Sequence, residues 1–263
     1  MRNKPIGIFD SGIGGLTVLK EIRRLLPCED IIYFGDTARV PYGGKSKSTV
    51  VKFSVNNTLF LLKKKVKIVV VACNTSSSVA INHLRDIFSI PIIGVIEAGV
   101  NRALELSPNK KIAIIGTRST IESKSYQKQI KSKDKKTKLY AKSCPLFVPL
   151  VEEGILNGNI VKEAMNMYLE ELKQNGVDTI ILGCTHYPLL KKQITRYLKG
   201  VFVVDSAKEV AQHTRDVLTI NGLVNKKKKT KEEFYVSDDP EGFMRSAQLF
   251  LKRKISKPKI ANV

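Results

Sequence analysis

Short, continuous runs of valine and isoleucine constrain the fold of this 263-residue chain more than any other feature. Residues 67–72 read KIVVVA, residues 111–116 read KIAIIG, and residues 178–183 read DTIILG. Strands that are apolar on both faces are typical of parallel sheets covered by helices, whereas strands with one exposed face alternate apolar and polar residues. The runs therefore predict an α/β fold with mainly parallel sheets.

Helix-like stretches separate the apolar runs along the chain. The predicted strands are 5–9, 31–35, 67–72, 91–95, 111–116, 138–141, 178–183, 201–204 and 234–236, and the predicted helices are 15–26, 46–65, 75–88, 97–106, 119–131, 159–174, 187–198, 207–220 and 239–252. The strands divide into two sub-arrays, so we expect two similar α/β halves facing each other across a cleft. The first half comprises residues 1–97 plus 206–263, and the second comprises residues 98–205.

Each unusual loop of the sequence follows directly on a predicted strand. Because right-handed crossovers place such loops at the carboxyl ends of parallel strands, we expect them to line the cleft. The loop FDSGIGG at 9–15 is not a dinucleotide fingerprint, since Thr17 stands where the third glycine of G-x-G-x-x-G belongs. Asp10 or Ser11 caps the following helix, or else Asp10 is a carboxylate that contacts a substrate amine or orients a thiolate.

A second loop, VPYGGKS at 40–46, contains a Pro-Tyr-Gly-Gly turn. Such a sequence is typical of a tight surface turn. It could also direct backbone N–H groups and the Tyr42 hydroxyl toward a carboxylate, because glycine permits close approach of an anion to the backbone.

Two loops share a cysteine at the end of an apolar run. Cys73 lies in VVVACNTSSS at 69–78, and Cys184 lies in GCTHYPLL at 183–190. One buried cysteine is commonly a small apolar filler. Here both precede a predicted helix, and helix N-termini stabilise thiolates and offer N–H groups to anions. Two thiols on opposite faces of a cleft suit removal of a proton from one face of a carbon and delivery to the other.

Metal and disulfide chemistry fit the sequence poorly. Its four cysteines form no CxxC pair, and its three histidines lack the paired spacing of zinc sites. The chain has no apolar signal-peptide core at its N-terminus and no uncharged apolar run of 18 residues. We therefore expect a cytoplasmic protein with no bound metal.

The formal charge of +21 is concentrated in lysine-rich runs such as 131–138 and 225–233. Neither run interleaves aromatic residues for base stacking, so the favoured interpretation is solvated surface. Nucleic-acid binding stays open as a secondary role, which salt-dependent binding to duplex DNA would reveal.

Taken in order, the segments FDSGIGGLTV, YFGDTARVPYG, ACNTSS, PLVEEG and GCTHYPLL resemble the signature segments of the glutamate racemases. The resemblance covers roughly residues 5–210. It implies a cofactor-independent enzyme that uses two bases to convert L-glutamate to D-glutamate for peptidoglycan. It also implies a protein that is often homodimeric, and we expect its two halves to close over glutamate.

The resemblance also assigns roles to residues. It implies that Cys73 exchanges the proton of the D-enantiomer with assistance from Asp10, and that Cys184 exchanges that of the L-enantiomer with assistance from His186. Glu152 matches a further assisting carboxylate, with Glu153 as the alternative. The positions that match substrate-binding residues are Asp10, Ser11, Tyr42, Gly43, Asn74, Thr75, Thr117, Thr185 and His186.

Aspartate racemases are the nearest alternative, since they are similar two-cysteine α/β enzymes. That family usually has glutamate at the position of His186, so this residue favours glutamate as the substrate. Cys28, Cys144, His83 and His213 lack the context of the two cysteine loops, and we expect no catalytic role for them.

Overall fold

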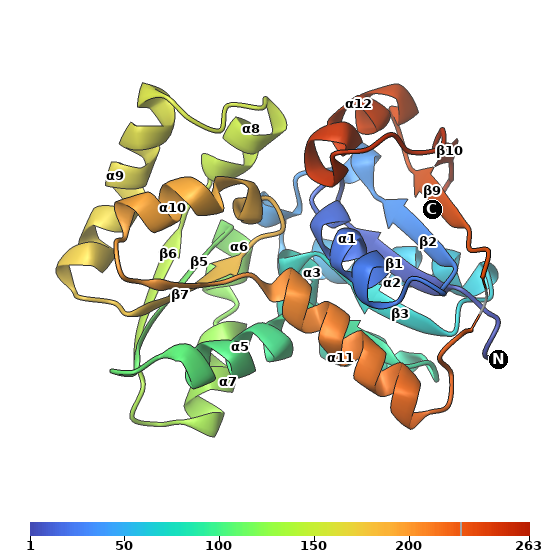
Figure 1. The fold of residues 1–263 in the computed structure, drawn as a ribbon, viewed down its shortest axis with the longest axis horizontal. Coiled ribbons are helices and arrows are strands. Elements are labelled where there is room, and N and C mark those ends of the chain that lie inside the picture. The colour runs from blue at the N-terminus through green and yellow to red at the C-terminus, as the bar shows by residue number, and fades with distance from the viewer. Residues whose placement is uncertain (227) are drawn as a thin grey trace.

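The computed structural model describes residues 1–226 and 228–263. Within these residues, parallel strands form two sheets that lie side by side in Figure 1 with helices packed around them. The first sheet has the order β10-β9-β2-β1-β3-β4, and the second has the order β6-β5-β7-β8. The strands are β1 (Ile6–Asp10), β2 (Ile31–Gly35), β3 (Ile68–Val71), β4 (Ile92–Gly94), β5 (Lys111–Gly116), β6 (Lys138–Ser143), β7 (Thr179–Gly183), β8 (Phe202–Val204), β9 (Glu232–Val236) and β10 (Lys259–Ile260).

Every strand pairing given by the described residues is parallel, which confirms the predicted fold class. The central strands β1, β3 and β7 are buried along their whole length, as their continuous apolar sequences predict.

The helices follow the predicted pattern with local differences. They are α1 (Leu16–Leu25), α2 (Lys47–Lys63), α3 (Asn74–Val79), α4 (Ile81–Ile87), α5 (Val95–Leu106), α6 (Arg118–Glu122), α7 (Ser125–Lys133), α8 (Phe147–Glu152), α9 (Asn159–Gln174), α10 (Lys191–Tyr197), α11 (Ser206–Ile220) and α12 (Pro240–Leu251), with 3-10 turns η1 (Thr37–Arg39), η2 (Tyr42–Gly44) and η3 (Tyr187–Leu190). The predicted helix 75–88 is divided in two at Ala80, and 119–131 is divided where Lys124 adopts a left-handed conformation.

Helix α8 and strand β10 were not predicted. Helix α8 contains Pro149, and an internal proline argues against a helix. The helix forms because Pro149 lies in its first turn, where the missing N–H has no intrahelical partner in any case.

The C-terminal part of the chain joins the first sheet. Helix α11 packs against α1 and α5, after which β9 pairs with β2, and β10 pairs with β9 (Figure 1). A buried ion pair between Lys67 and Glu29 anchors the segment that joins α11 to β9. Lys67 also donates to the Leu223 carbonyl of this segment, and Glu29 accepts from its Asn225 N–H. The domain boundaries at 97/98 and 205/206 stay a prediction.

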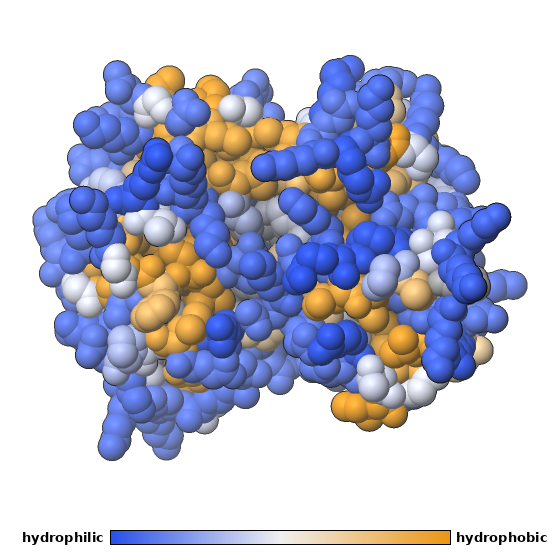
Figure 2. All heavy atoms as spheres, in the orientation of Figure 1, coloured by the Kyte–Doolittle hydropathy of each residue, from blue (hydrophilic) through white to orange (hydrophobic). Residues whose placement is uncertain are grey.

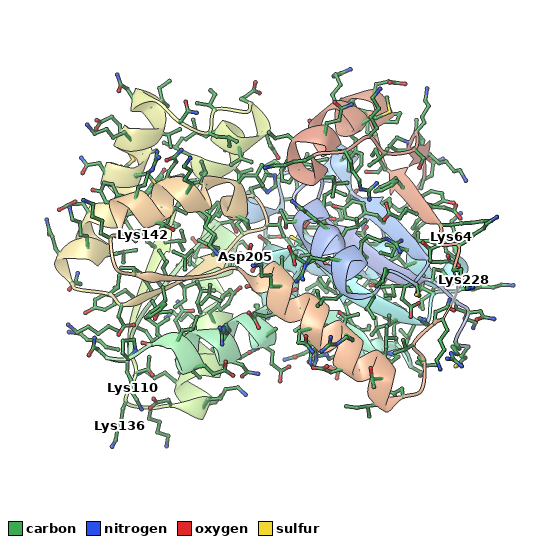
Figure 3. The ribbon with its side chains drawn as sticks, in the orientation of Figure 1. Lys64, Lys110, Lys136, Lys142, Asp205 and Lys228 are labelled. Atoms are coloured by element: carbon green, nitrogen blue, oxygen red, sulfur yellow. The ribbon has the colours of Figure 1, made fainter. Side chains whose placement is uncertain are left out.

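Lysines of the two basic runs lie on the surface. Lys131, Lys133, Lys135, Lys136 and Lys138 are exposed, as are Lys226, Lys228, Lys229 and Lys231, whereas Lys227 lies outside the described residues. Figure 3 shows Lys136 and Lys228 at the periphery, and Figure 2 shows hydrophilic side chains spread across the visible face. No helix in the described part of the chain is long and apolar enough to cross a membrane.

Candidate active site

A cavity of about 400 Å³ lies where loops from the two sheets meet. Its walls contain all but one of the predicted site residues: Ser11, Tyr42, Gly43, Cys73, Asn74, Thr75, Thr117, Glu152, Cys184, Thr185 and His186. The exception is Asp10, which is fully buried behind the wall. The carboxyl ends of β1, β3, β5 and β7 therefore meet at the cavity, as expected for parallel strands.

Cys73 follows β3 and is the N-cap residue of α3. Its sulfur accepts from the Ser76 N–H at 3.4 Å, and its thiol donates to the Ser11 hydroxyl at 3.7 Å. Burial, together with the negative charge of Asp10, raises the pKa of Cys73 to about 11. The Ser76 N–H at the helix N-terminus lowers this pKa as expected, but burial and Asp10 outweigh it, so the net shift is upward.

Asp10 lies at the end of β1, and burial raises its pKa against the charge of His186 and nearby backbone N–H groups. One carboxylate oxygen accepts from the Gly12 N–H at 3.0 Å, while the other has no hydrogen-bond partner among the described residues. Helix α1 begins after Gly15 without a side-chain cap, so neither Asp10 nor Ser11 is its N-cap.

Cys184 follows β7 and lies at one end of a short chain of interacting groups. Its sulfur is 3.8 Å from His186 Nδ1, and His186 Nε2 is 3.0 Å from Glu152 Oε1. Burial lowers the pKa of His186, but hydrogen bonds and charges from Cys184 and Glu152 outweigh this and raise the pKa to about 10. An imidazolium therefore adjoins Cys184 at neutral pH.

No α-helix begins directly after Cys184, since residues 187–190 form the 3-10 turn η3. The predicted helix-terminus effect is thus absent at this cysteine. His186 supplies the positive charge instead, and Phe250 of α12 packs edge-on against its ring with the centroids 5.7 Å apart.

The geometry separates Glu152 from its neighbour in sequence. Glu152 lines the cavity and pairs with His186, whereas Glu153 lines a different groove on the other side of α8. Glu152 is therefore the carboxylate in position to act on His186.

Turn η2 lines the cavity through Tyr42 and Gly43, but the Tyr42 hydroxyl does not face it as expected. This hydroxyl donates to Asp36 and accepts from the Asn57 side chain at 3.2 Å. A Cβ atom on Gly43 would lie only 2.6 Å from the Thr117 Cβ, so this turn packs directly against the start of α6. The part of the turn that remains for an anion is its backbone.

Hydroxyl and amide groups connect the two sides of the cavity. The Thr75 and Thr117 hydroxyls are 2.9 Å apart, and each also approaches Thr120. The Tyr126 hydroxyl donates to the Asn74 side chain at 2.6 Å, which fixes the orientation of this amide. Thr120 and Tyr126 were not singled out from the sequence, because their proximity depends on how the halves meet.

The remaining cavity residues had no motif to reveal them. Several are apolar residues from the segment around α8, and one, Arg118, is a cation that directly follows Thr117. The cavity residues that were not predicted are Val40, Pro41, Gly44, Arg118, Pro145, Val148 and Pro149.

A two-sheet, all-parallel α/β protein with one thiol from each side on a shared cavity fits the class of amino-acid racemases. The family model described as Asp/Glu/hydantoin racemase matches residues 14–214. A glutamate racemase from Sulfurihydrogenibium sp. is 47% identical over 240 residues, covering 91% of this chain and 90% of that protein. This chain belongs to the Asp/Glu/hydantoin racemase family and, within it, to the glutamate racemases.

Solved structures agree with this assignment. The structure of the glutamate racemase from Francisella tularensis, in complex with D-glutamate, has a TM-score of 0.94 at 38% identity and covers 100% of this chain and 98% of that one. An aspartate racemase from Picrophilus torridus matches with a TM-score of 0.57 at 18% identity, covering 86% of this chain and 96% of that one, which shows a shared fold alone.

Proposed function

We propose that this chain interconverts L- and D-glutamate by proton exchange at Cα, with Cys184 serving the L-enantiomer and Cys73 the D-enantiomer. The observation that carries the proposal is that the two thiols, from strands of different sheets, line one cavity. Membership of the glutamate racemases supports glutamate as the substrate.

The reaction needs one base and one acid on the two sides of the substrate. A thiolate takes the Cα proton, so that the Cα–H bond breaks and an S–H bond forms, while the second thiol donates its proton to the opposite face. The electron pair left on Cα is stabilised by preorganised donors rather than by an electron sink. Ser11, Asn74, Thr75, Thr117 and Thr185 supply such donors around the cavity.

The ionisable groups of the cavity suit conversion of the L-enantiomer. Cys73, with a pKa of about 11, is a thiol at neutral pH and can act as the acid. The imidazolium of His186 lies 3.8 Å from the Cys184 sulfur, and this placement supports Cys184 as the base. After each turnover the two cysteines exchange these states, and Asp10 and His186 assist the return.

Single cysteine variants in deuterated water test this mechanism. We expect Cys73→Ala and Cys184→Ala each to reduce racemisation by about 10²-fold or more, because each removes one acid–base group. Cys73→Ala should still exchange the Cα proton of L-glutamate through Cys184 without inverting it. Cys28→Ala, which changes a cysteine outside the cavity, is the control. Absence of deuterium at Cα with the wild-type protein would refute the two-thiol mechanism.

Substrate choice is tested separately by comparing kcat/KM for L-glutamate and L-aspartate without added cofactor. We expect glutamate to be strongly preferred, and equal or better turnover of aspartate would contradict the assignment.

The cellular setting follows from this activity. We propose that the protein acts in the cytoplasm, where it provides D-glutamate for peptidoglycan, and that it works as a homodimer. An exposed apolar surface along α8 and α9 supports the dimer, since surfaces of this kind commonly mark contacts between proteins. Its exposed residues are Leu146, Ile155, Ile160 and Met167.

A further inference from the structure

Arg118 places an uncommitted positive charge on the wall of the catalytic cavity. It is the first residue of α6, it is exposed, and it is the only lysine or arginine among the described cavity-lining residues. Within the described part of the chain it has no hydrogen bond or ion pair. Glu122 lies at the i+4 position of the same helix, and none of the described ion pairs joins the two side chains.

The surroundings of Arg118 are suited to an anion. The preceding residue, Thr117, packs directly against Gly43 in turn η2. Arg118 therefore lies beside the turn whose backbone N–H groups a glycine leaves accessible. A guanidinium and backbone donors at one end of the cavity are complementary to a carboxylate.

The other charged side chains of the described cavity wall are already paired. Glu152 and His186 interact at 3.0 Å, and His186 also adjoins Cys184. The substrate's Cα has to lie between the two thiols, where Asn74 and Thr185 are available to its own carboxylate. The side-chain carboxylate of glutamate therefore needs a second anion site away from the thiols.

We propose that Arg118 binds the side-chain carboxylate of glutamate, together with the backbone of turn η2, and so contributes to selecting a dicarboxylic amino acid. This inference rests on the proposed function. An arginine can hold a carboxylate through two parallel N–H···O bonds, which a lysine cannot reproduce.

Steady-state kinetics of Arg118→Gln and Arg118→Lys test the proposal. We expect Arg118→Gln to raise the KM for glutamate by about 10- to 100-fold with a smaller change in kcat, as for loss of a charge-assisted hydrogen bond. Arg118→Lys should recover part of the loss. Lys128→Gln on the neighbouring helix α7 removes the same charge from an exposed position outside the cavity and should leave KM unchanged.

Repeating the measurements at 0.5 M salt separates direct binding from long-range attraction. A KM difference that persists supports direct binding, because only the long-range effect is screened. A change in KM below twofold for Arg118→Gln, or a difference that disappears at high salt, overturns the proposal. Either result would leave deuterium exchange by the wild-type protein intact, so the proposed racemase activity is judged independently.

Discussion

Single residues set the ionisation of the cavity. Burial raises the pKa of the Cys73 thiol, and burial alone would lower the pKa of the His186 imidazole. His186 stays charged because Cys184 and Glu152 both interact with its ring. The two cysteines thus have different ionisable neighbours, Asp10 for Cys73 and His186 for Cys184, although the sequence motifs around them look alike.

The Glu152–His186 pair leads to a prediction about pH dependence. Glu152→Gln removes the carboxylate charge at Nε2, so the pKa of His186 falls and the alkaline limb of the kcat/KM profile should move to lower pH. We also expect kcat/KM at neutral pH to fall by about tenfold, equivalent to ~1.4 kcal/mol of transition-state stabilisation. The measurement is the pH profile of racemisation in both directions.

Glu153→Gln is the matched control, because Glu153 faces a separate groove. An unshifted alkaline limb in Glu152→Gln, or an equal effect in both variants, would contradict the assigned interaction.

The raised pKa of His186 also affects stability. A group whose folded pKa exceeds its unfolded value contributes stability fully below the unfolded pKa and loses it as the pH rises through the folded value. For His186 this window extends from about 6.5 to about 10. We expect His186→Asn to flatten the decline in unfolding free energy over this range, measured by urea denaturation. A decline as steep as in the wild type would exclude His186 as its source.

At the scale of elements, the loops after β1 and β7 approach each other closely at Gly14. A Cβ atom there would lie 2.2 Å from the Thr185 Oγ1 and 2.6 Å from the His186 Nδ1. We expect Gly14→Ala to displace the Cys184 loop and reduce kcat/KM by about 10²-fold, the loss that a misplacement of ~1 Å can cause. Coupled-assay kinetics would measure it.

Gly7→Ala is a milder steric control away from the cavity, because its Cβ atom would lie 2.9 Å from the Val66 side chain near the opposite end of β1. It should lower the melting temperature while retaining activity below that temperature. Loss of activity in Gly7→Ala to the same degree would show that the Gly14 effect is a general loss of stability.

The sequence was most informative about elements and least informative about their junctions. Buried strands such as β3 and β7 are continuous apolar runs, and the loops after them carry the two thiols, so both the fold class and the cysteine loops were predictable. The hydrogen bond that the Tyr42 hydroxyl donates to the Asp36 carboxylate was not, because it depends on tertiary packing. The hydrogen bond from the Tyr126 hydroxyl to the Asn74 side chain was not predictable either, because the two residues belong to parts of the chain that surround different sheets.

At the scale of the molecule, the cavity lies where loops from the two sheets meet, and the chain crosses between the sheets at few points. The chain passes from the first sheet to the second between β4 and β5, and it returns between β8 and β9. Figure 3 shows Asp205, which lies between β8 and α11, near the middle of the molecule. Contacts such as Thr75–Thr117 and Tyr126–Asn74 join the two sides near α3. From this arrangement we predict that the two sides rotate about these contacts when glutamate binds in the cavity.

We therefore expect glutamate to reduce the radius of gyration measured by small-angle X-ray scattering and to slow amide exchange in the loops after β3 and β7. At 100 times its Kd the ligand should stabilise the fold by about 2.7 kcal/mol. D-alanine, which lacks the side-chain carboxylate, serves as the comparison ligand. An unchanged radius with saturating glutamate would contradict closure.

The proposed homodimer makes a prediction about the apolar surface along α8 and α9. Ile160 is 64% exposed there, and burying such side chains between two copies would remove apolar area from water. If this surface forms the interface, Ile160→Glu introduces a charge into it and should convert the dimer to a monomer in sedimentation equilibrium.

Ile220→Glu is the matched control, since Ile220 is 83% exposed at the end of α11, away from this surface. Because α8 also carries Glu152, loss of the dimer should weaken the Glu152–His186 contact and reduce activity at protein concentrations where the wild type stays dimeric. A wild-type protein that sediments as a monomer, or an Ile160→Glu variant that remains dimeric, would contradict this interface.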